Sequence, residues 1–187
     1  MDPDLPLIEA IKAADGSALN ELIERHRTPL FHFVVRYLRD ATAAGDVVQE
    51  TFVRVYFKAA KFQPISSVKT WIYAIALNLC RDQGRRLARR RADISLQAPG
   101  PGDQPPMELA DDAPLPADRM VEKDRLSALG AAIDRLPHDL KAALILFALE
   151  GRSQRETGDI LGITPKAVET RVHHAKQKLR KLLGDGE

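Results

Sequence analysis

Apolar residues recur along most of the chain at the three- and four-residue spacing of amphipathic helices. Ser17 is expected to cap the first long helix and Pro29 to bend it. The apolar stripe of this helix consists of Leu19, Leu22, Ile23, Leu30, Phe31, Val34, Val35 and Leu38. Since no region is rich in the patterns of β-strands, the chain is predicted to be all-α.

Two further helices are expected in the first half of the chain. One begins near Asp40 or Thr42, and its apolar stripe consists of Val48, Phe52, Val55, Tyr56 and Ala59. After a loop, Lys61 to Ser67, a long helix begins near Ser67 and buries Val68, Trp71 or Ile72, Ile75 and Leu79. This helix continues into a dense cationic surface formed by Arg81, Arg85, Arg86, Arg89, Arg90 and Arg91.

The segment from Ala92 to Ala117 breaks the helical pattern. It holds six of the twelve prolines of the chain, which argue against a helix or a core strand, together with two glycines and five carboxylates. This composition is typical of a flexible linker. The sequence therefore predicts two small helical domains, residues 1–92 and 118–187, joined by a flexible Pro-rich acidic linker, residues 93–117.

The formal net charge of +2 is unevenly distributed. Residues 1–92 carry 15 basic and 10 acidic groups, and residues 118–187 carry 13 basic and 11 acidic groups. Residues 93–117 carry 5 acidic groups and none that are basic. Two positive domains that flank a negative linker indicate a polyanionic partner.

The second domain is expected to begin with two helices. The apolar stripe of the first, which ends at Pro137, consists of Leu126, Leu129, Ile133 and Leu136. The stripe of the second, which ends at Gly151, consists of Leu140, Leu144 and Ile145.

A helix-turn-helix motif follows these two helices. Ser153 and Glu156 are expected to form the capping box of a short helix, after which Gly162 supplies the left-handed conformation of a tight turn. Thr164 is expected to cap the next helix, with Pro165 at its first position. Two helices joined by so short a turn are typical of DNA-binding domains.

The second helix of the motif has one apolar and one polar face. Gly158 should let the two helices cross closely, and the apolar stripe consists of Val168, Val172, Ala175, Leu179 and Leu182. The polar face, which we expect to contact DNA, presents Lys166, Glu169, Thr170, Arg171, His173, His174 and Lys178. An ordinary solvated helix face would account for the charges, but not for the capping box and the Thr-Pro restart.

Three segments in register resemble the extracytoplasmic-function (ECF) sigma factors of the sigma-70 family. SQRETGDILGITPKAVETRVHHAKQKLRKLL, from Ser153, resembles their minus-35 recognition region, while GDVVQETFVRVY and SSVKTWIYAIALNLCRD resemble their core-binding and minus-10 regions. The resemblance covers nearly the whole chain apart from the linker. It implies a sigma factor for transcription initiation, without catalytic residues, that binds core RNA polymerase and promoter DNA.

The resemblance also implies roles for single residues. It assigns core-polymerase binding to Asp46, Gln49, Glu50 and, as packing, Phe52. It assigns capture of the single-stranded minus-10 element to Lys61, Ser66, Lys69, Trp71, Tyr73, Asn78, Arg81 and Arg85. Duplex minus-35 DNA would be read by the polar face described above together with Thr164.

Four plainer interpretations stay open beside these roles. The polar trio on the second helix can be a solvated face, and Trp71 can be a core residue. Asn78 can pair with Asp82 along one helix, and the arginines can be solvated or face the polymerase.

The chain departs from the family pattern in its core-binding segment. Where relatives have a string close to Asp-Ala-Glu-Asp, this chain has Ala43, Ala44, Gly45 and Asp46, so two carboxylates are missing. We expect weaker docking on a basic polymerase clamp and therefore conditional activity. Phosphorylation of Thr42 by a regulatory kinase would restore negative charge beside a helix N-terminus; alternatively, Thr42 only caps the helix.

A second departure concerns DNA recognition. Glu169 and His174 stand where relatives often have basic residues, so the promoter sequence of a relative cannot be transferred. The sequence leaves open whether an anti-sigma factor is a further partner.

Other function classes fit the sequence less well. A stand-alone DNA-binding regulator would not need the segment from Asp46 to Phe52, and an enzyme would need a phosphate loop, a metal-ligand cluster or a nucleophile with its base. No cofactor or metal is expected, because Cys80 is the single cysteine and consecutive histidines point apart on a helix. Without a signal peptide or a long apolar run, we expect a cytoplasmic protein that does not insert into membranes.

Overall fold

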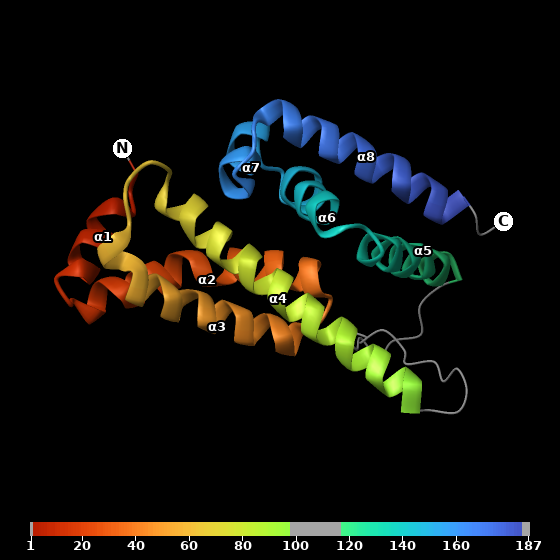
Figure 1. Cartoon of the computed structure of the whole chain (residues 1–187), viewed down its shortest axis with the longest axis horizontal. Helices are drawn as coiled ribbons and strands as arrows, with labels where there is room; N and C mark the ends of the chain where they lie inside the picture. The colour runs from red at the N-terminus through yellow and green to blue at the C-terminus, as the bar shows by residue number, and fades with distance from the viewer. Residues whose placement is uncertain (1, 98–116, 185–187) are drawn as a thin grey trace.

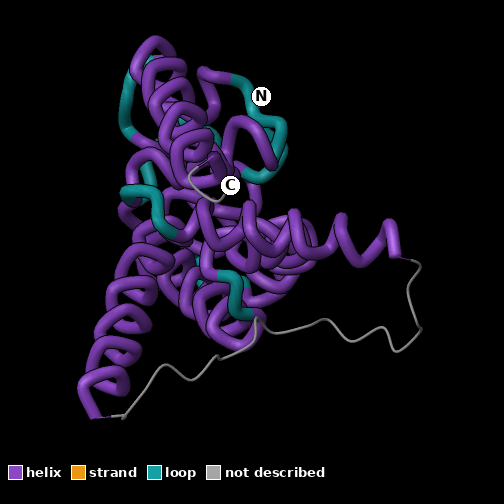
Figure 2. The backbone as a smooth tube through the Cα atoms, turned by 90° about the vertical axis from the view of Figure 1, so that its right-hand side faces the viewer, coloured by secondary structure: helices purple, strands orange, loops and turns teal. Residues whose placement is uncertain are grey.

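The computed structural model describes residues 2–97 and 117–184, and every regular element in these ranges is helical (Figures 1 and 2). The first domain comprises α1 (Leu5–Lys12), α2 (Gly16–Leu38), α3 (Ala41–Lys58), the short 3-10 helix η1 (Ala59–Lys61) and α4 (Val68–Gln97). The second comprises α5 (Ala117–Asp134), α6 (His138–Leu144), the π-helical turn η2 (Ile145–Leu149), α7 (Gln154–Leu161) and α8 (Pro165–Gly184). The prediction of an all-α chain with two helical domains is therefore confirmed.

Helix α4 enters the segment that was predicted to be a linker. The expectation that no helix occurs there is wrong for residues 93–97, which α4 includes. The first proline of the segment is Pro99, so nothing in residues 93–97 blocks helical hydrogen bonding. The rest of the predicted flexible linker, up to residue 116, lies outside the described residues.

The first domain is built from α2, α3 and α4, which pack against one another around an apolar core. Leu22 and Phe33 of α2, Val55 of α3 and Ile72 of α4 are fully buried in it. Tyr56 was expected in the buried stripe of α3, but its side chain is 42% exposed. It lines an open groove between α2 and α3.

Carboxylates rather than hydroxyls cap the second and third helices. Asp15 Oδ1 accepts a hydrogen bond from Ser17 N at 2.8 Å, so the expectation that Ser17 caps α2 is wrong. Asp40 Oδ1 accepts from Ala43 N at 2.9 Å, which confirms the expected start of α3 near Asp40. The N-cap of α3 is thus Asp40 and not Thr42.

The helix-turn-helix motif forms as predicted. Ser153 and Glu156 make a reciprocal capping box at the start of α7, and Gly162 ends this helix with a positive φ of 67°. Thr164 Oγ1 accepts from Ala167 N at 3.2 Å at the start of α8. Because these contacts fix both helix ends that flank the turn, they determine how α8 leaves α7.

The second domain packs its apolar residues between α6, α7 and α8. The predicted stripe of α8 is confirmed at Val168, Val172, Ala175 and Leu179, all of which are buried. In the expected stripe of α5, Ile133 is buried. Leu126 of the same stripe is 64% exposed and does not belong to the core.

The two domains contact each other directly. In Figure 1, α7 lies above the N-terminal half of α4, and these two helices are in contact, as are α2 and η2. The C-terminal end of α4 projects away from the rest of the molecule in both views (Figures 1 and 2). Among the described residues, no helix is long and apolar enough to cross a membrane.

Gly158 gives a test of the close crossing in the helix-turn-helix motif. A Cβ at this position would lie 2.6 Å from Ile163 O, a backbone atom that cannot move without opening the turn. We expect Gly158→Ala to lower the free energy of unfolding by about 2 kcal/mol, measured by urea denaturation.

Gly84→Ala is the matched control, because a Cβ at this helical position of α4 meets nothing within 4 Å. It should raise the free energy of unfolding by roughly 0.5–1 kcal/mol. Equal effects of the two substitutions would contradict the close crossing.

Candidate nucleic-acid interface

The polar face of α8 is open to solvent. Lys166, Glu169 and Thr170 are exposed in its first turns, as is Thr164 before it. His173, His174 and Lys178 continue this exposed face, whereas Arg171 is half-buried. An exposed helix face in the second position of a helix-turn-helix motif has the geometry that enters a major groove.

Local contacts hold several of these side chains in place. Lys166 Nζ lies 2.9 Å from Glu169 Oε2, and Thr170 Oγ1 donates to Lys166 O at 3.0 Å. Arg171 reaches back toward Asp139 of α6, with 3.8 Å between the charged groups. These exposed pairs are weak, so DNA phosphates and base edges could replace them at low cost.

The loop of residues 62–67 and the start of α4 form a second candidate surface. Trp71 is half-buried and packs its ring 4.8 Å from that of Phe62, which is buried. Lys61, Lys69 and Asn78 are exposed, and Ser66 is partly exposed. Asn78 and Asp82 are both exposed, and no hydrogen bond between them occurs in the described part of the chain.

Ile65 is a residue that sequence reasoning missed. Its side chain is 87% exposed at the tip of the loop, between Pro64 and Ser66. An isolated apolar residue in a short polar loop was the available signal. A side chain of this kind can support an unstacked base by apolar contact.

Tyr73 is buried, whereas a side chain that contacts a base has to be exposed. It is 1% exposed, and the guanidinium of Arg152, which precedes α7, lies 3.8 Å from the centre of its ring. Burial raises the pKa of the Tyr73 hydroxyl, and the Arg152 charge opposes this shift. In this conformation the second domain therefore covers Tyr73, so its expected contact with DNA is not available.

The arginines that follow on α4 differ in exposure. Arg81 is half-buried near the second domain, whereas Arg85, Arg86 and Arg89 are exposed. The side chains of Arg90 and Arg91 lie outside the described residues. The exposed members form a positive surface on the projecting end of α4, suited to duplex phosphates.

A polar ridge and an apolar groove lie side by side on the first domain. The ridge consists of Asp46, Gln49 and Glu50 of α3, all exposed, with Glu50 paired to Arg54 at 2.8 Å. Phe52 is buried, as expected for a packing residue. The groove, of about 540 Å³ between α2 and α3, is lined by Leu19, Ile23, Arg27, Phe31, Gly45, Val48, Gln49, Phe52, Val53, Tyr56 and Phe57.

The pattern of residues along the chain did not predict this groove. Val53, Tyr56 and Phe57 are 43%, 42% and 75% exposed, so α3 carries apolar side chains on two faces. Within residues 2–97 and 117–184, only the inner face packs against another helix. Large exposed apolar side chains beside an open groove are typical of a protein-binding surface.

Aromatic and charged contacts hold the second domain on α2 and α4. The Tyr37 hydroxyl and His138 Nδ1 are hydrogen-bonded, with the two rings edge-on at 5.7 Å between centres. The Lys141 ammonium lies 4.8 Å from the centre of the Tyr37 ring. Two ion pairs flank this contact, Arg36 with Glu150 and Arg39 with Asp134.

His138 is held in its neutral form at this contact. Burial, and after it the charge of Arg81 on α4, lowers the pKa of His138 to about 4. Asp139 opposes the shift, while Arg85 and Lys141 add to it. Because the protonated imidazole is disfavoured here, the contact loses stability in acid.

In the described ranges, no three potential ligand side chains come together to hold a metal ion. The adjacent rings of His173 and His174 have their centres 6.1 Å apart on the exposed face of α8.

Comparison with known proteins identifies both domains. Residues 22–90 match the family described as sigma-70 region 2, and residues 126–179 match sigma-70 region 4. The chain is 32% identical to the RNA polymerase sigma factor CnrH of Cupriavidus metallidurans, over 98% of this chain and 97% of that protein. It is 28% identical to the ECF RNA polymerase sigma factor SigW of Bacillus subtilis, over 95% of each protein.

A solved structure agrees with these matches. The structure of CnrH in complex with the cytosolic domain of CnrY aligns over 100% of both chains, with a TM-score of 0.68 and 26% identity. By its sequence and its fold, this chain belongs to the ECF sigma factors of the sigma-70 family, the non-catalytic subunits that direct core RNA polymerase to promoters.

Proposed function

We propose that this sigma factor docks on core polymerase through the polar ridge and the apolar groove of its first domain. The observation that carries the proposal is their position side by side on α3, where Gln49 belongs to both. Apolar contact in the groove would supply affinity, and the carboxylates of Asp46 and Glu50 would supply orientation. A stand-alone regulator has no use for this surface.

The two DNA elements would be read by separate parts of the chain. The loop of residues 62–67, with Lys61, Lys69, Trp71 and Asn78, is suited to single-stranded minus-10 bases. The exposed face of α8 is suited to duplex minus-35 DNA. The arginines on the projecting end of α4 would bind the phosphates of the intervening duplex.

Binding both elements at once requires the domains to separate. Two helical turns of DNA between the promoter elements span about 70 Å. In this structure, however, α7 packs on α4, and Arg152, which precedes α7, covers the ring of Tyr73. We infer that the compact arrangement is a resting state, and that the polymerase and the promoter open it.

Docking on the polymerase would be conditional, because the start of α3 lacks two of the carboxylates that relatives have there. Ala43 and Ala44 are buried in α3, and Gly45 lies at the rim of the groove with open space around it. The ridge therefore has one carboxylate, Asp46, in this first part of α3.

Thr42 is placed to supply the missing charge. It is exposed in the first turn of α3, one helical turn before Asp46, and the cap of this helix is Asp40. A phosphate on Thr42 would face the positive end of the helix and extend the ridge. A regulatory kinase is the partner that this chemistry requires.

A second protein partner could act on the same surface. The relative CnrH is known in complex with the cytosolic domain of CnrY, and this chain offers an apolar groove that a protein segment can fill. We propose that an anti-sigma factor competes with the polymerase for the groove. We also propose that this sigma factor acts in the cytoplasm.

Promoter reading by α8 can be tested with the reconstituted polymerase and a promoter library. Arg171→Ala should weaken selection of the minus-35 element roughly tenfold, because a guanidinium contact to a base edge is lost. Affinity for core polymerase should not change. Arg180→Ala, an exposed arginine further along α8, is the matched control and should retain minus-35 selection. A holoenzyme that forms no open complex on any promoter would refute the proposed function itself.

The role of Thr42 can be tested by measuring the affinity for core polymerase. Thr42→Asp should bind up to about fivefold more tightly than Thr42→Ala, since one exposed ion pair contributes roughly 0.2–1 kcal/mol. Gly45→Glu, which adds a carboxylate at the rim of the groove, serves as the positive control. Equal affinity of the two Thr42 variants, alongside a gain for Gly45→Glu, would exclude the switch at Thr42.

The proposed resting state predicts that the packing of the two domains against each other depends on pH. The pKa of His138 is about 4 in the compact form, against the ordinary value of 6.5, so an opened or unfolded form binds more protons between these values. The compact form should therefore weaken as the pH falls from 6.5 toward 4. Fluorophores on Lys58→Cys and Lys181→Cys should show a fall in energy transfer over this range.

Two variants control the pH experiment. His138→Gln removes the titrating group and should flatten the dependence, whereas His32→Gln, at an exposed position of α2, should leave it unchanged. A steep dependence that survives in His138→Gln would contradict the role of His138. Cys80 will not take up the label, because burial raises its pKa to about 12.

A further inference from the structure

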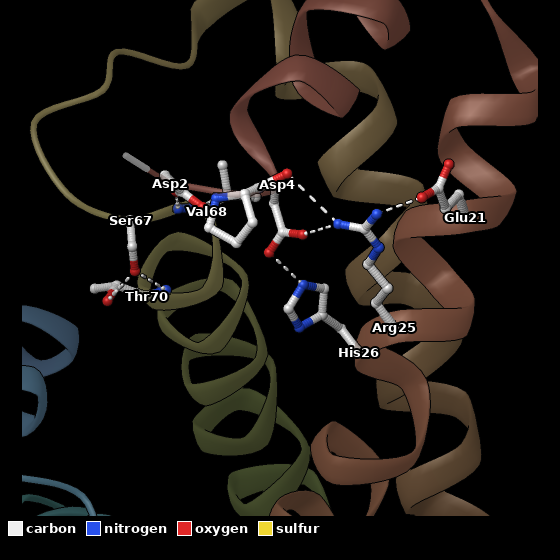
Figure 3. Close-up of polar contacts among 9 residues, drawn as sticks. Asp2, Asp4, Glu21, Arg25, His26, Ser67, Val68 and Thr70 are labelled. Atoms are coloured by element: carbon white, nitrogen blue, oxygen red, sulfur yellow. Dashed lines mark hydrogen bonds and ion pairs between the residues drawn. The ribbon is translucent and has the colours of Figure 1, made fainter.

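The segment Asp2–Asp4, before α1, is fastened to two other helices. Figure 3 shows its two carboxylates, with Asp4 facing α2 and Asp2 facing the first turn of α4. This segment lies outside residues 22–90, which match sigma-70 region 2. Its partners Arg25, His26 and Val68 lie within that range.

Asp4 is the anchor of this segment. It is 5% exposed, and its Oδ2 accepts a hydrogen bond from His26 Nε2 at 2.7 Å. Its Oδ1 accepts from Arg25 Nη1 at 3.0 Å, and Arg25 is also paired with Glu21. A buried carboxylate with two charged or polar donors on one helix has little freedom to move.

Asp2 connects Asp4 to the start of α4. Its Oδ2 accepts from Val68 N at 2.6 Å, and its Oδ1 accepts from Asp4 N at 3.0 Å. Val68 is the first residue of α4, whose early N–H groups lack partners within the helix. Ser67 Oγ satisfies the amide of Thr70, so two side chains from different parts of the chain cap this helix.

The capped end of α4 is also where the candidate minus-10 surface begins. The loop of residues 62–67 leads into Val68, and Lys69 and Trp71 follow within the first turn. The loop is held from one side by the contact of Phe62 with Trp71. Asp2 holds it from the other side, at the point where loop and helix meet.

We propose that Asp2 is a positioning residue for capture of the minus-10 strand. By fixing the first amide of α4 to the anchor on α2, it sets the direction in which the loop and the side chains of Lys69 and Trp71 meet the DNA. Its negative charge also occupies the positive end of α4, so that a phosphate of the strand does not bind there out of register. The proposal rests on the assignment of this loop to the minus-10 element.

The test measures promoter opening by the holoenzyme. The readout is the fluorescence of 2-aminopurine placed in the minus-10 element. Asp2→Ala should reduce opening roughly fivefold, the factor that corresponds to loss of a helix cap of about 1 kcal/mol. Asp2→Asn keeps an acceptor oxygen and should restore part of the opening. Affinity for core polymerase and binding of minus-35 duplex should stay as in the wild type.

Asp15→Ala separates positioning from stability. It removes the same kind of capping carboxylate, at the start of α2, and should lower the thermal stability without reducing promoter opening. The proposal is overturned if Asp2→Ala opens the promoter as well as the wild type does, or if Asp15→Ala reduces opening as much as Asp2→Ala. If the wild-type holoenzyme opens no promoter, the proposed function fails, and the role of Asp2 fails with it.

Discussion

Helix α4 is the element on which both domains depend, because each packs against a different part of its surface. Ile72 belongs to the core with α2 and α3, while its neighbour Tyr73 lies beneath Arg152 of the second domain. An aromatic face covered by a guanidinium is a favourable contact that also removes the ring from water. The same helix begins at the candidate minus-10 loop, so domain packing and DNA access are coupled through one rigid element.

On the proposed role of Tyr73, the compact form would compete with DNA for this side chain. Tyr37, His138 and Lys141 form a contact in which a neutral imidazole lies among cations and is hydrogen-bonded to the Tyr37 hydroxyl. The flanking ion pairs are partly exposed and contribute little. On the proposal that the polymerase and the promoter open the compact form, these are the contacts that would break.

Much of the fold could be predicted because it depends on local signals. The capping box of Ser153 and Glu156, the left-handed Gly162 and the spacing of Val168 and Val172 all act within a few residues of one another. Other features depend on residues that are far apart in the sequence. Tyr73 has the residue type of a base-stacking side chain, but only the position of Arg152 shows that it is covered.

The same distinction holds for the candidate sites. The exposed face of α8 followed from its helical period, whereas the groove between α2 and α3 requires two helices to be placed in space. Asp2 carried no local signal at all, because its partner Val68 is far away in the sequence. Residues that act through long-range contacts are those that a pattern along one helix cannot reveal.

The burial of Cys80 has a consequence for the conditions in which this factor can work. It is the single cysteine of the chain, it is fully buried, and burial raises its pKa to about 12. Peroxides and disulfides react with exposed thiolates, and the folded protein offers none. Oxidative stress therefore leaves the thiol of the folded chain chemically unaltered.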